Sequence, residues 1–316
     1  MKILITADWH IKGERPICRL DENWIESQRE TIAAIREVYE KTGCEQMWIL
    51  GDLFDAPKCA TAAVNMLIEE LQKFPKDSVK VLCGNHDLKD HNYGNLEECS
   101  IGTIKHLFAD VPAKLSSVSV AGGLLKVSAN PFGMDDEESS ADIICTHQLT
   151  FPNEKARPMA DCGVLAQDLL DKWRAAKIIF TGDYHHAFIH EEIKPGDFVD
   201  RVTTGRFVVN PGCINIQKAD ELDYIPGVYV WDTSRSVDVA FQRWNLNPQR
   251  ENCTRDHIEA RESKETMLSE VVETIKGGAE ITLDFDSNLE QQVNRTSSAI
   301  IDEYSIMREE MNGEAK

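Results

Sequence analysis

A short polar stretch at residues 83–87 reads Cys83-Gly84-Asn85-His86-Asp87, and it directly follows the apolar run 79–82 (VKVL). Asn, His and Asp side chains carry polar groups that need partners when they stand behind a buried strand. A polar turn, closed by bonds from Asn85 and Asp87 to the backbone, would satisfy them. A functional site at the strand end would satisfy them equally well, so the stretch alone leaves both explanations open.

Four further polar clusters favour the functional site. Each follows a short apolar run and again contains Asp or His: Asp8-Trp9-His10, Gly51-Asp52-Leu53-Phe54-Asp55, Thr146-His147 and Gly182-Asp183-Tyr184-His185. In an open α/β sheet, ligands bind at the carboxyl ends of the strands. Carboxylate, amide and imidazole groups together suit Mn²⁺, Fe or Zn²⁺, and this set is richer than a single ion requires. The sequence therefore predicts a centre of two ions that share a bridging carboxylate, as is common in phosphoester hydrolysis.

Apolar periodicity predicts an α/β fold. Strands at 2–6, 47–50 and 79–82 alternate with helices at about 21–42 and 61–74, which favours a largely parallel sheet with helices on both faces. Further on, we expect a helix over 96–108, a hairpin over 115–129, a strand over 142–145, a helix over 164–173 and a strand over 177–180. Three β-type runs then follow without helices between them, at 207–210, 228–231 and 237–244. They predict either a second sheet or an antiparallel edge of the first.

A change to polar composition near 245–255 predicts two domains, 1–248 and a small C-terminal α+β module at 249–316. The module would contain a helix that ends at Gly277-Gly278, a short strand, and a last helix that opens at Ser287 with a capping-box pattern. The apolar stripe of this last helix needs a partner surface. It either packs within its own module or docks a second protein.

Composition limits the partners and the compartment. The 316 residues carry a formal net charge of −20, which repels nucleic acid, so a polyanionic substrate needs a local attraction such as bound divalent ions or a basic partner. Nine cysteines without a Cys-x-x-Cys pair predict free thiols rather than disulfides or structural zinc. No apolar run is long enough to span a membrane, and residues 1–7 already form a strand. We expect a cytoplasmic protein with no membrane partner.

The order Asp-x-His, Gly-Asp-x-x-Asp, Gly-Asn-His-Asp, His and Gly-x-x-His resembles the calcineurin-like metallophosphoesterase superfamily over about residues 1–245. The resemblance implies a β-sheet sandwich flanked by helices, and a hydrolase with two divalent ions, Mn²⁺ before Mg²⁺, Fe or Zn²⁺. It also implies the metal ligands: Asp8, His10, Asp52 and His185 for one ion, with Asp52 bridging to a second ion held by Asn85, His147 and Asp183. His86 would be the general acid or phosphate-stabilising residue, oriented by Asp87.

One position departs from the family pattern. The last motif is usually Gly-His-x-His, but Asp183 stands here in place of the first imidazole. We expect the extra carboxylate to favour the harder ions Mn²⁺ and Mg²⁺. Alternatively, His186 or another side chain is the ligand, or the second site is weak. Asp55 is expected to orient a ligand imidazole, and Trp9 and Tyr184 fit either a pocket wall or a ring that stacks on a base.

Within the superfamily, the chain is most similar to the SbcD and meiotic-recombination-eleven nucleases. The similarity lies in the opening stretch 2–10 (KILITADWH), the helix that follows it, the stretch 209–214 with the acidic pair Asp220-Glu221, and the C-terminal module. It implies an exonuclease or endonuclease subunit for DNA repair, recombination or replication, partnered by DNA and an SMC-like ABC ATPase. It also suggests a homodimer through helix 21–42, and the compact size suits a phage-borne version. The alternatives are a small-molecule or nucleotide phosphodiesterase or phosphatase, and a metal-binding scaffold that has lost catalysis.

Overall fold

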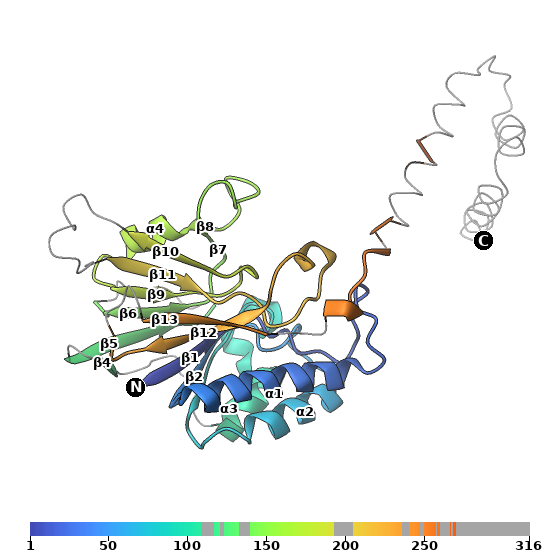
Figure 1. Cartoon of the computed structure of the whole chain (residues 1–316), viewed down its shortest axis with the longest axis horizontal. Helices are drawn as coiled ribbons and strands as arrows, with labels where there is room; N and C mark the ends of the chain where they lie inside the picture. Colours follow the sequence, from blue (N-terminus) through green and yellow to red (C-terminus); the bar gives the residue numbers. More distant parts are fainter. Residues whose placement is uncertain are drawn as a thin grey trace, which may run out of the picture. The chain divides into compact units, whose positions relative to one another are not determined.

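The chain divides into two compact units, Met1–Cys253 and Thr254–Lys316. A computed structural model describes residues 1–108, 117–120, 123–132, 140–192, 205–235, 240–246 and 250–256, together with 258, 259, 266, 268 and 269 (Figure 1). Almost all of the predicted C-terminal module lies outside these residues, so the module and its boundary stay predictions. No helix in the described part of the chain is long and apolar enough to cross a membrane.

The first sheet has five strands in the order β13-β12-β1-β2-β3. Their bounds are β1 Lys2–Thr6, β2 Gln46–Leu50, β3 Val79–Leu82, β12 Gly227–Asp232 and β13 Phe241–Asn245. The strands β1, β2 and β3 are parallel, while β12 and β13 add an antiparallel edge beside β1. The carboxyl ends of β1, β2 and β3 therefore meet at one edge.

The second sheet has six strands in the order β10-β11-β9-β6-β5-β4. Their bounds are β4 Ser117–Val120, β5 Gly123–Asn130, β6 Ile143–Thr146, β9 Ile178–Phe180, β10 Phe188–Glu192 and β11 Arg206–Asn210. The four central strands are parallel, and β4 and β10 are antiparallel edges. A separate two-stranded pair joins β7, Thr150–Phe151, to β8, Val164–Leu165.

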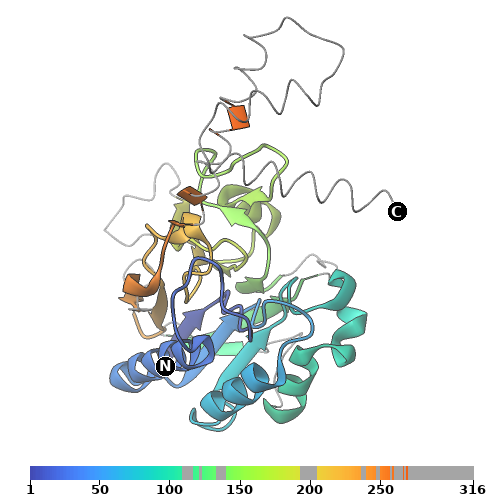
Figure 2. The same ribbon diagram turned by 90° about the vertical axis from the view of Figure 1, so that its right-hand side faces the viewer.

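Helices cover the outer face of each sheet, so the layers run helix, sheet, sheet, helix (Figures 1 and 2). The helices are α1 Trp24–Thr42, α2 Thr61–Leu71, α3 Ser100–Phe108 and α4 Ala166–Lys172, and the 3₁₀ turns are η1 Lys89–His91, η2 Tyr93–Glu98, η3 Ala219–Glu221 and η5 Arg250–Asn252. Buried side chains of α1, α2 and α3 pack on the first sheet, and those of α4 pack on the second. Helix α1 is capped at both ends: the side chain of Asn23 accepts the N–H of Glu26 at the start, and Gly43 closes the helix with left-handed backbone at φ 68°.

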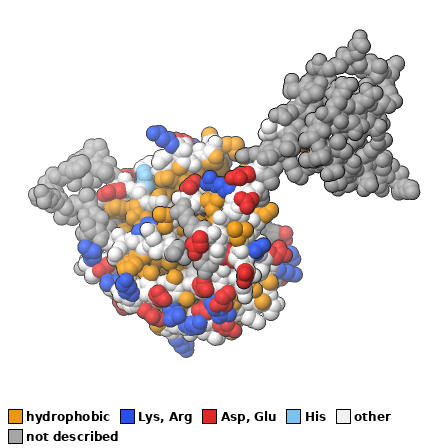
Figure 3. Space-filling model, turned by 45° about the vertical axis from the view of Figure 1, so that its right-hand side comes forward, with side chains coloured by type: hydrophobic (Ala, Val, Ile, Leu, Met, Phe, Trp, Pro, Cys, Tyr) orange, Lys and Arg blue, Asp and Glu red, His pale blue; other side chains and the backbone are white. Residues whose placement is uncertain are grey.

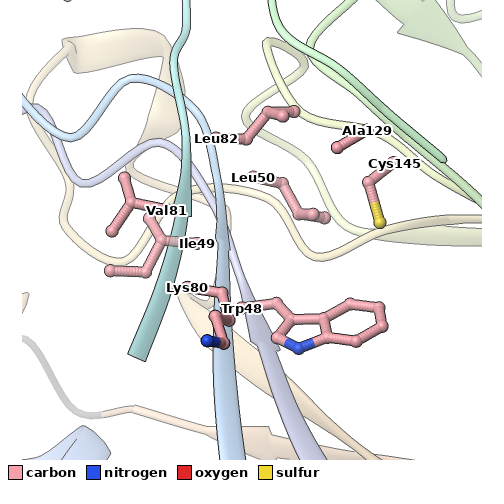
Figure 4. Close-up of a pocket in the computed structure, with 8 residues that line it drawn as sticks. All are labelled: Trp48, Ile49, Leu50, Lys80, Val81, Leu82, Ala129 and Cys145. Atoms are coloured by element: carbon pink, nitrogen blue, oxygen red, sulfur yellow. The ribbon is translucent and has the colours of Figure 1, made fainter. Parts of the chain in front are cut away.

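The inner faces of the two sheets form a shared apolar core. The rings of Trp48, Phe180 and Trp231 contact one another, with centroids 5.5 to 6.2 Å apart; Trp48 meets the other two edge to face, and Phe180 is tilted against Trp231. A small apolar gap remains between Leu50 and Leu82 on one sheet and Cys145 on the other (Figure 4). It holds no cluster of titratable groups.

The structure confirms the α/β sandwich flanked by helices. It corrects the interpretation of one sheet with helices on both faces, because the strands divide into two sheets that each carry helices on one face only. Both explanations of the late β-type runs apply, since β11 belongs to the second sheet while β12 and β13 form the antiparallel edge of the first. The edge strand β10 was not predicted, and the helix expected over 96–108 begins at Ser100, after the 3₁₀ turn η2.

Candidate metal centre

The five polar clusters follow β1, β2, β3, β6 and β9, and the structure brings them together at the carboxyl ends of both sheets. The backbone at this edge is unusual. Asp8, His10, Asp52 and Asp183 all have positive φ angles, between 45° and 72°. Left-handed backbone at non-glycine residues costs conformational free energy, and such residues cluster at functional sites. The turns that carry these four residues therefore point to a functional site.

The first group of candidate ligands contains Asp8, His10 and His185, whose ligand atoms all lie within 4.8 Å of one another. The Nε2 atoms of His10 and His185 are 3.0 Å apart. Asp8 and His10 come from the loop after β1, whereas His185 comes from the loop after β9, so the group joins the two sheets.

The second group contains Asp8, Asp52 and His147. Oδ2 of Asp52 lies 3.3 Å from Nε2 of His147 and 3.7 Å from Nε2 of His10, so this oxygen stands between the two groups. Asn85 joins through its Oδ1 atom, which is 3.0 Å from Nε2 of His147. Asp52 therefore lies where a carboxylate that bridges two ions would have to lie.

Two buried carboxylate oxygens, Asp8 Oδ2 and Asp52 Oδ2, have no hydrogen-bond partner among the described residues. A buried carboxylate oxygen without a partner is costly. The other oxygens are held: Asp8 Oδ1 accepts the N–H of Asp183 at 3.0 Å, and Asp52 Oδ1 accepts the N–H of His86 at 2.9 Å. The donor set of carboxylates and imidazoles fits divalent ions, and the two unpaired oxygens face the place where such ions would bind.

The carboxylates and imidazoles of the centre shift one another's pKa values. Burial raises the pKa of Asp8, and the imidazoles around it offset this only in part. Burial acts in the same direction on Asp52, but the imidazoles of His147 and His10 outweigh it and lower the pKa of Asp52. Burial would lower the pKa of His147, whereas Asp52 and Asp8 raise it well above its usual value. Bound divalent ions would replace these imidazole protons, because a ligand histidine must be neutral.

Two of the ligand imidazoles have a hydrogen-bond partner for their second nitrogen. Nδ1 of His147 is 2.7 Å from the carbonyl oxygen of Leu50, and Nδ1 of His185 contacts Oε1 of Glu221. When Nδ1 donates its proton in this way, Nε2 is left with the lone pair that binds a metal. Nδ1 of His10 makes no hydrogen bond among the described residues and lies 3.5 Å from Oδ1 of Asp55, within ion-pair distance.

Glu221 is the functional residue that the sequence did not reveal. It was noted only as half of an acidic pair, yet it is buried on the turn η3 and its second oxygen accepts the backbone N–H groups of Gln217 and Lys218, at 2.9 and 3.1 Å. Its spacing from His185 matches no local pattern, so only the resemblance could have pointed to it.

His86 and Asp87 differ from the expected pair. His86 is exposed, and its Nδ1 lies 2.8 Å from the carbonyl oxygen of Asp55. Asp87 is fully buried and its carboxylate accepts the backbone N–H groups of Leu53, Phe54 and Gly84. The contact expected between Asp87 and His86 is therefore corrected, because Asp87 ties two turns together while a backbone carbonyl orients His86. Burial and the nearby Asp52 raise the pKa of Asp87 to about 7.

Asp183 takes part through its backbone. Among the described residues, its carboxylate belongs to none of the groups of candidate ligands, although it lies close enough to raise the pKa of His147. The alternative ligand His186 is exposed and packs between the rings of Tyr184 and Tyr224, at centroid distances of 5.5 and 5.0 Å, outside both groups.

The two aromatic candidates for base stacking differ in burial. Trp9 is fully buried, and its indole N–H donates to Oγ1 of Thr6 at 2.9 Å, so it belongs to the core. Tyr184 is half-buried against Phe151, with ring centroids 5.0 Å apart.

A family profile matches the part of the chain that carries the five polar clusters. The profile of the calcineurin-like phosphoesterase family matches residues 1–185. A search of curated proteins found no match. Similar solved structures include a metallophosphoesterase from Sphaerobacter thermophilus, with 14% identity, 78% of this chain and 89% of that chain covered, and a TM-score of 0.36. The phosphoesterase YfcE from E. coli has 17% identity, covers 78% of this chain over its whole length, and gives a TM-score of 0.37. Vps29 from Entamoeba histolytica, solved with Zn²⁺, has 10% identity, with 78% of this chain and 98% of that chain covered, and a TM-score of 0.34.

Proposed function

Because the chain belongs to the calcineurin-like phosphoesterase family, we propose that it is a phosphodiesterase that uses two divalent ions, Mn²⁺ by preference, to cleave DNA. The family comprises metal-dependent hydrolases of phosphate esters, and the described residues include the ligand groups that such chemistry needs. The choice of DNA rests on the sequence similarity to the SbcD and meiotic-recombination-eleven nucleases.

One observation carries the two-metal proposal. Oδ2 of Asp52, which makes no hydrogen bond among the described residues, stands between the Nε2 atoms of His10 and His147, at 3.7 and 3.3 Å. Asp8, His10, Asp52 and His185 would hold one ion, and Asp52, Asn85 and His147 the other, with Asp183 beside them. Bound ions of this kind lower the pKa of a water molecule and neutralise charge on phosphoryl oxygens.

His86 is suited to deliver a proton. Its Nδ1 is held by the carbonyl oxygen of Asp55, which fixes the ring and leaves Nε2 available to the substrate. The ring lies edge to face with His10, with ring centroids 4.9 Å apart, and His86 forms a further group of possible ligands with His10 and Asp55, separate from the group around Asp52. We infer that the imidazolium form of His86, with Nδ1–H on the carbonyl oxygen of Asp55, passes its Nε2 proton to the leaving oxygen or stabilises the phosphoryl group.

Partners follow from the same similarity. By this similarity, an SMC-like ABC ATPase would dock on the C-terminal module 249–316. The chain has no phosphate-binding Gly-x-x-x-x-Gly-Lys-Ser/Thr loop of its own, so any ATPase activity would come from such a partner. A homodimer through α1 receives less support. None of the exposed large apolar side chains in the described part lies on α1, and its outer face carries the ion pairs Arg29–Glu26 and Arg36–Glu40.

A small-molecule phosphodiesterase is the second candidate, and charge favours it. The net charge is −20, and on the face shown in Figure 3 the described Lys and Arg side chains alternate with Asp and Glu rather than forming a basic patch. A long polyanion therefore needs the ions or a partner for attraction.

The test is Mn²⁺-dependent cleavage of end-labelled linear DNA, run beside bis-p-nitrophenyl phosphate. His86→Ala should retain its metal and lose about 10²- to 10⁴-fold in turnover, the usual contribution of a general acid. Asp52→Ala should lose both metal and turnover. His106→Ala is the matched control, because His106 on α3 is exposed and paired with Glu97 of the turn η2.

The outcomes separate the candidates. Cleavage of both substrates, lost in His86→Ala, supports the nuclease. Cleavage of the small diester alone supports the second candidate, and no metal-dependent cleavage of either supports a scaffold without catalysis. Absence of metal from purified His86→Ala would show instead that His86 is a ligand.

A further inference from the structure

Lys12 is held at a fixed position beside the metal centre. The carboxamide of Gln28, fully buried on α1, binds both sides of its backbone: Oε1 accepts the N–H of Lys12 at 3.0 Å, and Nε2 donates to its carbonyl oxygen at 2.8 Å. The preceding residue, Ile11, forms a parallel bridge with Phe54. The stretch after His10 is therefore fastened to α1 and to the loop after β2, which restricts where the side chain of Lys12 can reach.

The ammonium group of Lys12 pairs with Asp55, and Asp55 in turn contacts His10 and His86. Its Nζ is 3.3 Å from Oδ2 of Asp55. The other oxygen of Asp55 is 3.5 Å from Nδ1 of His10, and the carbonyl oxygen of Asp55 binds His86. One residue thus separates the cation from His86.

Stability gives little reason for this ion pair. The side chains of Lys12 and Asp55 are 24% and 35% exposed, and exposed ion pairs contribute about 0 to 1 kcal/mol. Asp55 already has His10 as a partner. By contrast, a fixed and partly exposed cation beside the reacting groups would bind a phosphate strongly, above all in a chain with a net charge of −20.

We propose that Lys12 binds the substrate phosphate adjacent to the one that is cleaved. The inference rests on the proposed phosphodiesterase function and extends it, since it makes the enzyme prefer substrates with more than one phosphate. A single-phosphate diester would occupy the metal centre without reaching Lys12.

The experiment compares the full chain, loaded with Mn²⁺, on dithymidylate and on dithymidylate that carries one extra methyl-esterified phosphate at the 5′ or the 3′ end. The extra phosphate at one of the two ends should raise kcat/KM of the wild type about tenfold, as expected for one charge-assisted hydrogen bond. Lys12→Gln should reduce this preference to less than twofold, and Lys12→Arg should keep most of it. Because dithymidylate is the internal reference, any general loss of rate through Asp55 or His10 cancels in the ratio.

Lys177→Gln is the matched control. Lys177 is likewise a partly exposed lysine in an ion pair, with Asp142 at 3.1 Å, but it precedes β9 and so lies at the amino end of the strand. This variant should keep the wild-type preference.

Equilibrium binding provides a readout that does not depend on turnover. With Ca²⁺ in place of Mn²⁺, the affinity for a fluorescent thymidine oligonucleotide should fall in Lys12→Gln. The slope of log K against log salt should become shallower by about 0.7, the value for one phosphate contact with a single strand.

Two results would overturn the proposal: a preference for the extra phosphate that survives Lys12→Gln, and a wild type with no preference at either end. Failure of the DNA proposal looks different. A Lys12-dependent preference among the dinucleotides, without cleavage of long DNA, would leave the Lys12 contact standing and reject DNA as the substrate.

Discussion

At the scale of single residues, the geometry of the candidate metal centre depends on the side chains that hydrogen-bond the candidate ligands. Glu221 orients His185 and is itself held by two backbone N–H groups, so both of its oxygens are used. Burial would raise the pKa of Glu221, but His185 and these N–H groups lower it, so the carboxylate stays ionised. A charged partner increases the basicity of the imidazole and fixes its tautomer.

Glu221→Gln should therefore weaken Mn²⁺ binding about 10- to 100-fold, the usual cost of removing such a partner. The glutamine amide would present an N–H group either to His185 or to the backbone donors, and one contact must be lost. Isothermal titration with Mn²⁺ measures the change. Asp220→Asn, at the exposed neighbouring position, is the control. An unchanged Mn²⁺ affinity in Glu221→Gln would show that His185 does not need this partner.

Sequence reasoning went further for the candidate ligands than for their supports. Six of the predicted ligands follow strands in recognisable motifs, and the structure brings them together: Asp8, His10, Asp52, Asn85, His147 and His185. Their role as ligands stays a prediction. Glu221 lies on a turn far along the chain, and Asp87 binds backbone groups of a turn that precedes it by more than thirty residues. Such contacts depend on how loops meet in space, which no local spacing encodes.

At the scale of elements, the turns after the strands must approach one another very closely. A Cβ atom on Gly84 would lie 2.1 Å from Oδ1 and 2.3 Å from the backbone nitrogen of Asp52. The absence of a side chain lets the turn after β3 reach the turn after β2, so that the N–H of His86 can bind Asp52.

Gly84→Ala should push Asp52 out of place. We expect a loss of about 1 to 3 kcal/mol of stability, typical of overpacking, together with a loss of bound Mn²⁺. Thermal unfolding and metal analysis of the purified protein measure the two effects. Gly94→Ala is the matched control, because its Cβ would come no closer than 3.1 Å to Asn92 at an exposed site. Full metal content in Gly84→Ala would contradict this account.

The elements themselves were largely readable from the sequence, and their assembly was not. Buried strands and amphipathic helices can be predicted from the periodicity of apolar residues. However, strands and helices alternate along the chain in the same way whether they form one sheet with helices on both faces or two sheets with helices on one face each. Strand β10 escaped notice because Phe188–Glu192 is half-exposed at a sheet edge and ends in two glutamates. Apolar alternation is weak in such a strand.

At the scale of the whole catalytic unit, a buried ion pair fastens the loop before α1 to the end of the unit. Arg19 donates to both oxygens of Asp21, at 2.7 and 2.8 Å, and both side chains are about 1% exposed. The N–H of Leu20 binds the carbonyl oxygen of Asn252, and Arg19 forms a bridge with Cys253. Both members of the pair also contact this distant segment, since Arg19 donates to Sγ of Cys253 at 3.1 Å and Asn252 donates to Oδ1 of Asp21 at 3.3 Å, more than 200 positions along the chain.

Breaking this pair should make the unit less stable and change how its stability responds to acid. Burial would raise the pKa of Asp21, but Arg19 and Ser27 outweigh it and lower that pKa. A carboxylate with a depressed folded pKa stabilises the protein above its unfolded pKa of about 3.9, and this stabilisation disappears as the pH falls through the folded value. Asp21→Asn should cost about 3 to 5 kcal/mol at pH 7 and remove this part of the acid sensitivity.

Urea unfolding from pH 7 down to pH 3, with a chelator present to exclude metal effects, measures both changes. The control is Glu26→Gln, which removes an exposed ion pair with Arg29 and should cost less than about 1 kcal/mol. Equal costs for the two substitutions would mean that the Arg19–Asp21 pair does not fasten the loop.

The ligand groups draw on both halves of the sandwich, since Asp8 and Asp52 follow strands of one sheet and His147 and His185 follow strands of the other. An ion bound there would hold the two sheets together as well as take part in the reaction. By mass action, a ligand at a hundred times its Kd adds about 2.7 kcal/mol to the stability of the fold that binds it. The lifetime of this protein in a cell would then follow the supply of free metal, and scarcity of the ion would remove both the activity and the molecule that carries it.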